Sequence, residues 1–160
     1  LNKPKNIVKP SKSGIVVKGI DNCLVKLSKC CNPVPGDPII GYITKGRGVS
    51  IHRKDCKNVK DLFLDEEGSR MIDVYWYSEK EAAYNVDIEI YANDRDGLLA
   101  DQIAQINNTK TKLMAVNCRA NKERIAITEM TIEVENLDEL NNVLKALRKV
   151  DSVYEVKRKK

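Results

Sequence analysis

Residues 84–106, YNVDIEIYANDRDGLLADQIAQI, place a strand pattern directly before a helix pattern. Apolar and polar residues first alternate, which predicts a half-buried strand. The apolar positions of this strand are Val86, Ile88 and Ile90. Apolar residues then recur at helical spacing, as Leu99, Ile103 and Ile106. We expect this helix to start near Gly97, with Asp94 or Asp96 as its cap.

The rest of the second half repeats these two patterns. A further strand is indicated by the alternating residues Met114, Val116 and Cys118. The apolar positions then change parity after Ile127, which predicts a β-bulge near Thr128 and Glu129. A second helical stripe consists of Leu137, Leu140, Val143, Leu144 and Leu147. A last strand should turn Tyr154 and Val156 inward, which completes the βαββαβ order of a ferredoxin-like unit.

The first half has shorter elements and more turns. Apolar, β-branched runs predict strands at 15–17, 24–27, 39–44, 49–51 and 71–76. Pro33, Pro35 and Pro38 exclude regular structure before Ile39. Residues 45–48 form a basic, glycine-rich turn, and residues 54–64 suit a short helix. We therefore predict an α+β protein with a polar linker at 1–13, a small mixed α+β domain at 14–78 and a ferredoxin-like domain at 84–160.

Composition and charge narrow the class of protein. Residues 1–63 carry 13 basic and four acidic residues, a net charge of +9, whereas residues 64–160 carry a net charge of −4. This asymmetry predicts two domains with different partners, the first of them drawn to phosphate. Neither a membrane span nor a signal peptide is apparent. Five cysteines without an export signal favour a reducing cytoplasm, and Leu1 in place of Met leads us to expect a piece of a longer protein.

Thiols and the single histidine gather in the first half. Cys30, Cys31, His52 and Cys56 are the residue types from which a soft-metal site is built. His52 and Cys56 are four residues apart, so a helical turn would place both on one side. Adjacent thiols reach one metal only if the backbone turns, so a reduced, buried cysteine cluster and a thiol nucleophile remain alternatives. Cys23 and Cys118 have no partner pattern, and we expect both to pack in the core.

Two further groups of residues are candidate binding sites. Basic residues crowd one region and predict contacts with a polyanion. These residues are Lys45, Arg47, Arg53, Lys54, Lys57 and Lys60. The loop that precedes the helix of the second half offers free N–H groups for a carboxylate or phosphate, although its two aspartates also complement the helix dipole. The candidate residues of this loop are Asn93, Asp94, Asp96, Gly97, Leu98 and Leu99.

Two motifs in tandem resemble a known family. Residues 29–37, KCCNPVPGD, with 48–56, GVSIHRKDC, resemble the zinc-finger-like, ribosome-intersubunit domain of long Rel/SpoT-type stringent-response proteins. Residues 94–99, DRDGLL, in their βαββαβ context resemble the ACT domain of the same proteins. The resemblance covers about residues 14–160, and the tandem order makes it specific.

The resemblance implies a function as well as a fold. It implies the regulatory C-terminal part of a (p)ppGpp synthetase/hydrolase, or GTP pyrophosphokinase, whose catalytic domains lie upstream. It implies docking on ribosomal RNA, sensing of uncharged tRNA, and a Cys-Cys-His-Cys set at Cys30, Cys31, His52 and Cys56 with zinc as the candidate metal. We expect no catalytic site here, because one histidine cannot build a hydrolase metal centre.

An alternative function is a stand-alone amino-acid sensor that dimerises through the second domain. Some members of the family resemble other ACT proteins in binding valine or isoleucine. Steep salt dependence of ribosome binding would separate the first function from this one. An RNA-recognition motif is disfavoured, because residues 124–135 contain no aromatic side chain on which bases could stack.

Overall fold

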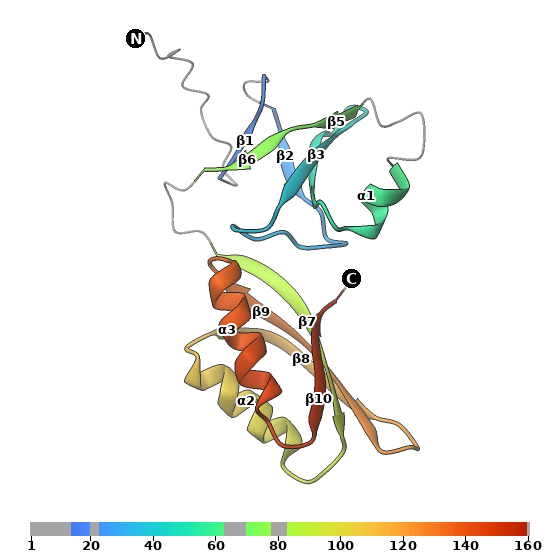
Figure 1. Cartoon of the computed structure of the whole chain (residues 1–160), viewed down its shortest axis with the longest axis vertical. Coiled ribbons are helices and arrows are strands. Elements are labelled where there is room, and N and C mark those ends of the chain that lie inside the picture. The colour runs from blue at the N-terminus through green and yellow to red at the C-terminus, as the bar shows by residue number, and fades with distance from the viewer. Residues whose placement is uncertain (1–13, 20–22, 63–69, 78–82, 160) are drawn as a thin grey trace. The chain divides into compact units, whose positions relative to one another are not determined.

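The computed structural model describes residues 14–19, 23–62, 70–77 and 83–159 (Figure 1). The predicted linker at 1–13 lies outside these residues. The chain divides into two compact units, the first drawn from residues up to 82 and the second from residues 83–160 together with 34–36. Each unit mixes strands with helix, so the predicted α+β class is confirmed.

The first unit contains a four-stranded sheet and a two-stranded sheet. Its elements are β1 (Ile15–Val17), β2 (Val25–Leu27), β3 (Ile39–Thr44), β4 (Gly48–Arg53), α1 (Lys57–Leu62), β5 (Met71–Ile72) and β6 (Val74–Trp76). The larger sheet has the order β2-β4-β3-β5, and β1 pairs with β6 in the smaller one. β3 and β4 form an antiparallel hairpin, and β2 joins β4 in parallel. Ile15, Val17, Ile39, Val49, Ile51 and Val74 form the buried core.

The β3–β4 hairpin is the framework of the first unit. Its first strand and its turn lie where the sequence predicted them, but the second strand continues to Arg53, so that His52 is on a strand. Gly48 opens this strand with a φ of +81°, and a Cβ there would lie 2.1 Å from the carbonyl oxygen of Leu24. The N–H of Val49 donates to that same oxygen. Glycine at this position therefore lets β2 approach the hairpin.

Two predictions for the first unit are wrong. Residues 71–76 do not form one strand, because the chain crosses at the exposed Asp73 from β5, which pairs with β3, to β6, which pairs with β1. The predicted helix at 54–64 starts only at Lys57. The reason is a turn in front of it, which the N–H of Cys56 closes on the carbonyl of Arg53. Residues 63 and 64 lie outside the described residues.

The second unit has the predicted βαββαβ order. Its elements are β7 (Tyr84–Asn93), α2 (Leu98–Asn108), β8 (Lys112–Ala120), β9 (Ile125–Val134), α3 (Leu137–Arg148) and β10 (Val153–Arg158). The strands form one antiparallel sheet in the order β10-β7-β9-β8. Both helices cover one face of this sheet (Figure 1). The predicted stripe of the second helix is confirmed by the burial of Leu140, Val143, Leu144 and Leu147.

The predicted bulge in β9 is wrong. β9 pairs with β7 without a break, and its even-numbered residues from Ala126 to Val134 are all buried. The change of parity in the sequence arises because small Ala126 and polar Thr128 occupy core positions, while Ile125 and Ile127 lie on the other face. The irregular pairings are elsewhere, in β8 and β10.

The start of α2 also differs from the prediction. Gly97 occupies the N-cap position in a left-handed conformation, and no side chain caps the helix, so neither Asp94 nor Asp96 has the predicted role. The buried residues are Leu98, Gln102 and Ile106. Leu99 and Ile103 are half-buried. The first turn thus faces the core one residue earlier than the apolar pattern suggested.

Two residues expected inside lie outside. Cys118 is exposed, like most residues of the edge strand β8. Tyr154 is 56% exposed because it lies at the irregular pairing of β10, whereas Val156 is buried as predicted. Cys23 is half-buried against the core of the first unit, as expected.

Candidate metal centre and basic surface

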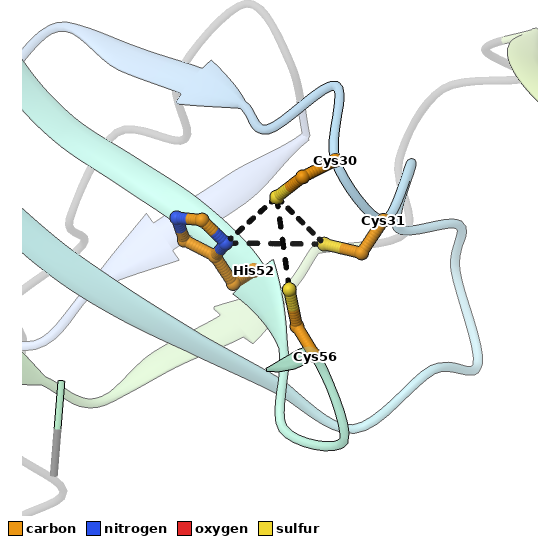
Figure 2. A group of neighbouring side chains, drawn as sticks. All are labelled: Cys30, Cys31, His52 and Cys56. Atoms are coloured by element: carbon orange, nitrogen blue, oxygen red, sulfur yellow. Dashed lines mark hydrogen bonds between the residues drawn. The ribbon is translucent and has the colours of Figure 1, made fainter. Parts of the chain in front are cut away.

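The four predicted ligands lie together in the first unit (Figure 2). Cys30 and Cys31 come from the turn that follows β2, His52 from β4, and Cys56 from the turn before α1. One donor atom from each residue lies within 4.8 Å of all the others. Cys31, His52 and Cys56 are buried, and Cys30 is half-buried. The expected convergence of these side chains is therefore confirmed.

The backbone turns sharply at the adjacent cysteines. The N–H of Asn32 donates to the carbonyl of Ser28 at 3.0 Å, and Asn32 has a φ of +42°. In a straight strand, neighbouring side chains would point to opposite faces. Because residues 28–32 form a turn instead, Cys30 and Cys31 both face the cluster, as Figure 2 shows.

His52 and Cys56 meet by a different route from the one predicted. The expected helical turn is absent, because His52 lies within β4 and Cys56 precedes α1. The turn from Arg53 to Cys56 brings the chain back toward the strand. The two side chains therefore meet, as predicted, but a strand followed by a turn brings them together instead of a helical turn.

Burial shifts the pKa values of Cys30, Cys31 and His52 toward their neutral forms. It raises the pKa of the Cys31 thiol from 9.0 to about 12, although the N–H that Arg53 donates to this sulfur favours the thiolate. Burial, and then the neighbouring Cys56, raise the pKa of Cys30. Burial also lowers the pKa of His52 below 6.5. A raised pKa leaves less thiolate at neutral pH, which disfavours Cys30 and Cys31 as nucleophiles.

The spacing of the donor atoms fits a tetrahedral ion. Cys30 Sγ lies 4.0 Å from Cys31 Sγ, 3.6 Å from Cys56 Sγ and 3.4 Å from His52 Nδ1. Around an ion with zinc-like bond lengths, neighbouring sulfurs are about 3.8 Å apart, and sulfur and nitrogen about 3.6 Å. Three thiols and one imidazole are also a common structural zinc set. The cluster could therefore hold a metal ion.

Two serines that the sequence reasoning missed surround the far side of the imidazole. Ser28 Oγ is 2.9 Å and Ser50 Oγ is 3.2 Å from His52 Nε2. Ser50 could have been found, because it precedes His52 by two residues on the same face of a strand. Ser28 could not, because its position depends on the pairing of β2 with β4.

The predicted RNA-binding residues form two groups. Lys45 and Arg47 are exposed at the β3–β4 turn, and Lys54 and Lys57 are exposed near the other end of the hairpin. Strand geometry puts these ends about 17 Å apart. Arg53 differs from both groups, because its side chain is 13% exposed and forms an ion pair with Asp55. The basic residues that are close in sequence therefore lie in two separate groups, one at each end of the hairpin.

The loop before α2 is partly occupied by its own contacts. Arg95 forms an ion pair with Asp101 and donates to the carbonyl of Asp151. Leu98 is 3% exposed and belongs to the core, whereas Leu99 is half-buried. Asn93, Asp94, Asp96 and Gly97 are exposed. Of the predicted ligand-binding residues, Leu98 is thus the one whose side chain faces away from solvent.

Comparison with known proteins assigns both units to families. Residues 15–77 match the RelA/SpoT RIS domain, and residues 80–158 match the ACT domain. The chain therefore belongs to the RelA/SpoT family and is homologous to the C-terminal part of RelA/SpoT proteins, with the two domains in tandem. The resemblance stated from the motifs is confirmed.

Curated relatives are named GTP pyrophosphokinase. The protein of Streptomyces coelicolor is 40% identical over 145 residues, which cover 91% of this chain and 17% of the relative. The protein of Escherichia coli strain K12 is 38% identical over 90% of this chain and 19% of its own length. A crystal structure of the ACT domain from GTP pyrophosphokinase of Chlorobium tepidum shares 27% identity and a TM-score of 0.44, and covers 48% of this chain and 99% of that one. The chain thus spans less than a fifth of the length of these curated relatives.

Proposed function

We propose that this region regulates a (p)ppGpp synthetase/hydrolase by docking on ribosomal RNA and tRNA in the cytoplasm. The binding of ribosomal RNA or tRNA to this region would be relayed to upstream catalytic domains of the same protein. The observation that carries the proposal is the tandem of RIS and ACT domains, in a region homologous to GTP pyrophosphokinases over about 90% of this chain. Among the described residues, no helix is long and apolar enough to cross a membrane.

The β3–β4 turn offers a first contact point for phosphate. Lys45 and Arg47 project from it, and both are exposed. Gly46 between them has a φ of +74°, and a Cβ there would meet nothing within 4 Å. A nucleic-acid backbone could therefore approach this turn closely, with two cations beside it.

Residues near the metal cluster offer a second contact point. Lys54 and Lys57 are exposed and lie on either side of Cys56 in the sequence. The cluster fixes the turn that carries them, so their placement depends on its integrity. Arg53 contributes less, because Asp55 already offsets its charge.

Paired charge removals test the docking proposal. We expect Lys45→Gln/Arg47→Gln and Lys54→Gln/Lys57→Gln each to weaken ribosome binding. Each lost phosphate contact should also reduce the slope of log affinity against log salt by about one unit. Lys145→Gln/Lys149→Gln at the C-terminal end of α3 removes the same charge from the second unit and should leave the slope unchanged. Equal slopes for all four proteins would refute the electrostatic docking.

We further propose that the four-residue cluster holds zinc as a structural ion. The ion would tie residues of the turn after β2 to β4 and the turn before α1. Thiolate-rich, tetrahedral sets favour zinc over harder divalent cations. Metal analysis of purified protein, with Cys56→Ser as the comparison, should give about one zinc per chain for the native sequence and less for the variant.

A second candidate function is amino-acid sensing by a dimer of the second unit. Two observations favour it. The first turn of α2 has no side-chain cap, and edge strand β8 exposes Met114 and Val116. Titration calorimetry with valine and isoleucine tests the ligand, and sedimentation tests the dimer. No heat and no shift in melting temperature at millimolar amino acid would leave the loop as an ordinary helix start.

A further inference from the structure

The two nitrogens of the His52 ring face different surroundings. Nδ1 faces the thiols, at 3.4 Å from Cys30 Sγ and 3.9 Å from Cys31 Sγ. Nε2 faces two hydroxyls, those of Ser28 at 2.9 Å and Ser50 at 3.2 Å. The hydroxyls are 2.6 Å from each other. His52 is 9% exposed and Ser28 is 8% exposed, so bulk water has little access to this side of the ring.

Metal binding would require one tautomer of this ring. A ligating Nδ1 must offer its lone pair, and the neutral ring then carries its proton on Nε2. That N–H needs an acceptor, because leaving it unpaired in a buried place is costly. A serine oxygen can accept it while the contact between the two serines uses one of their own protons. The pair therefore satisfies Nε2 in the metal-binding tautomer.

We propose that Ser28 and Ser50 are positioning residues that present His52 Nδ1 to the metal. This inference rests on the proposed metal-binding role of the cluster. Both serines are fixed by the sheet: Ser50 lies on β4, and the N–H of Ser28 donates to the carbonyl of Ile51 at 2.9 Å. The two serines thus connect the pairing of strands β2 and β4 to the orientation of the His52 ring. Groups of this kind are worth about 10-fold to 100-fold in metal affinity.

Alanine substitutions test the proposal through metal affinity. We expect Ser28→Ala and Ser50→Ala each to weaken zinc binding about 10-fold to 100-fold in competition with a chelator. Ser50→Thr keeps the hydroxyl on a strand residue and should restore affinity. Thr44→Ala is the matched control, because it removes a hydroxyl that donates to Gly48 at the far end of the same sheet. It should leave the affinity unchanged.

A double-mutant cycle separates positioning from general stability. In a His52→Ala background, the further change Ser50→Ala should cost no additional affinity, because there is no imidazole to orient. Cobalt bound in place of zinc should show an altered ligand-field spectrum in Ser50→Ala and a native one in Ser50→Thr. If Ser28→Ala does not fold, the half-buried Ser50 carries the test alone.

The outcomes distinguish this inference from the functional proposal. Native zinc affinity in both Ser28→Ala and Ser50→Ala would overturn the positioning role. So would a Ser50→Ala substitution that weakens zinc binding as much in the His52→Ala background as in the native protein. Failure of the native chain to bind zinc or cobalt would overturn this inference and the metal site together. Ribosome docking would still be judged separately by its salt dependence.

Discussion

Two glycines of the same hairpin turn have unequal roles. Gly46 and Gly48 both have left-handed backbones, with φ of +74° and +81°. A Cβ at Gly46 would meet open space, whereas a Cβ at Gly48 would overlap the backbone of Leu24. The strain of a left-handed backbone applies to both positions, but the overlap applies only to Gly48.

This difference predicts the result of two alanine substitutions. Gly46→Ala should lower the free energy of unfolding of the first unit by about 1–2 kcal/mol, the cost of left-handed alanine. Gly48→Ala should cost about 1–3 kcal/mol more, because β2 must move away from β4. Urea unfolding followed by fluorescence measures both, since Trp76, the single tryptophan, packs against the core of the first unit. Equal losses would show that the approach of Leu24 does not constrain the turn.

Titration of the cluster predicts how stability depends on pH when a chelator removes metal. Below pH 6.5 the unfolded chain protonates its histidine, while buried His52 resists, so unfolding becomes more favourable. Above pH 9.0 the unfolded thiols lose protons that Cys31 retains when folded, which also favours unfolding. The free energy of unfolding should therefore be highest between these values and fall on both sides.

The measurement is a series of urea unfolding curves at different pH. With zinc present the alkaline decline should disappear, because the folded cluster then binds its thiols as thiolates. A metal-free profile that is flat from neutral to alkaline pH would contradict the assigned shifts.

At the scale of the elements, the cluster joins three segments of the first unit. The turn at residues 28–32, the end of β4 and the start of α1 meet at its four side chains. α1 has six residues, too few for a helix to be stable by itself. The position of α1 therefore depends on the side chains of Cys56 and Val59, which are both buried against Cys31 and Ile40.

Chelation should consequently unfold the first unit in preference to the second. We expect a chelator to shift the Trp76 fluorescence transition to lower urea, since a bound ion contributes its binding free energy to folding. The circular dichroism of the helices in the second unit should change much less. Cys56→Ser should show the early transition without chelator. A chelator that moves neither signal in zinc-loaded protein would contradict a structural ion.

Across the whole molecule, the five cysteines differ sharply in environment. Cys118 is exposed on an edge strand, and Cys23 is half-buried beside the first core. Cys31 is 6% exposed and Cys56 is 7% exposed, and both lie in the cluster. Cys31 combines a raised pKa with low exposure, so its thiol should be alkylated slowest.

Alkylation followed by peptide mass spectrometry tests this order. With metal removed, iodoacetamide should modify Cys118 first and Cys31 much later. Zinc should protect Cys30, Cys31 and Cys56 but leave Cys118 and Cys23 unaffected, which makes the latter two internal controls. Ribosome binding that survives modification of Cys30 and Cys31 would show that the cluster does not support docking.

The sequence by itself determined the features that depend on local periodicity. The alternation of Val86, Ile88 and Ile90 and the stripe from Leu140 to Leu147 report which side of an element is buried, and the structure confirms both. The motif with two adjacent cysteines also named residues of the Cys/His cluster that the structure brings together. In each case the information lies in residue types and spacings that one element or one family motif contains.

The tertiary structure decided the features that depend on pairing between distant segments. β9 has apolar residues on both faces, so no parity rule could tell which face the helices cover. The basic residues are close in sequence, yet the hairpin carries them to opposite ends. Ser28 reaches His52 only because β2 pairs with β4. A side chain's neighbours across a sheet are set by strand register, and register is a property of the whole fold.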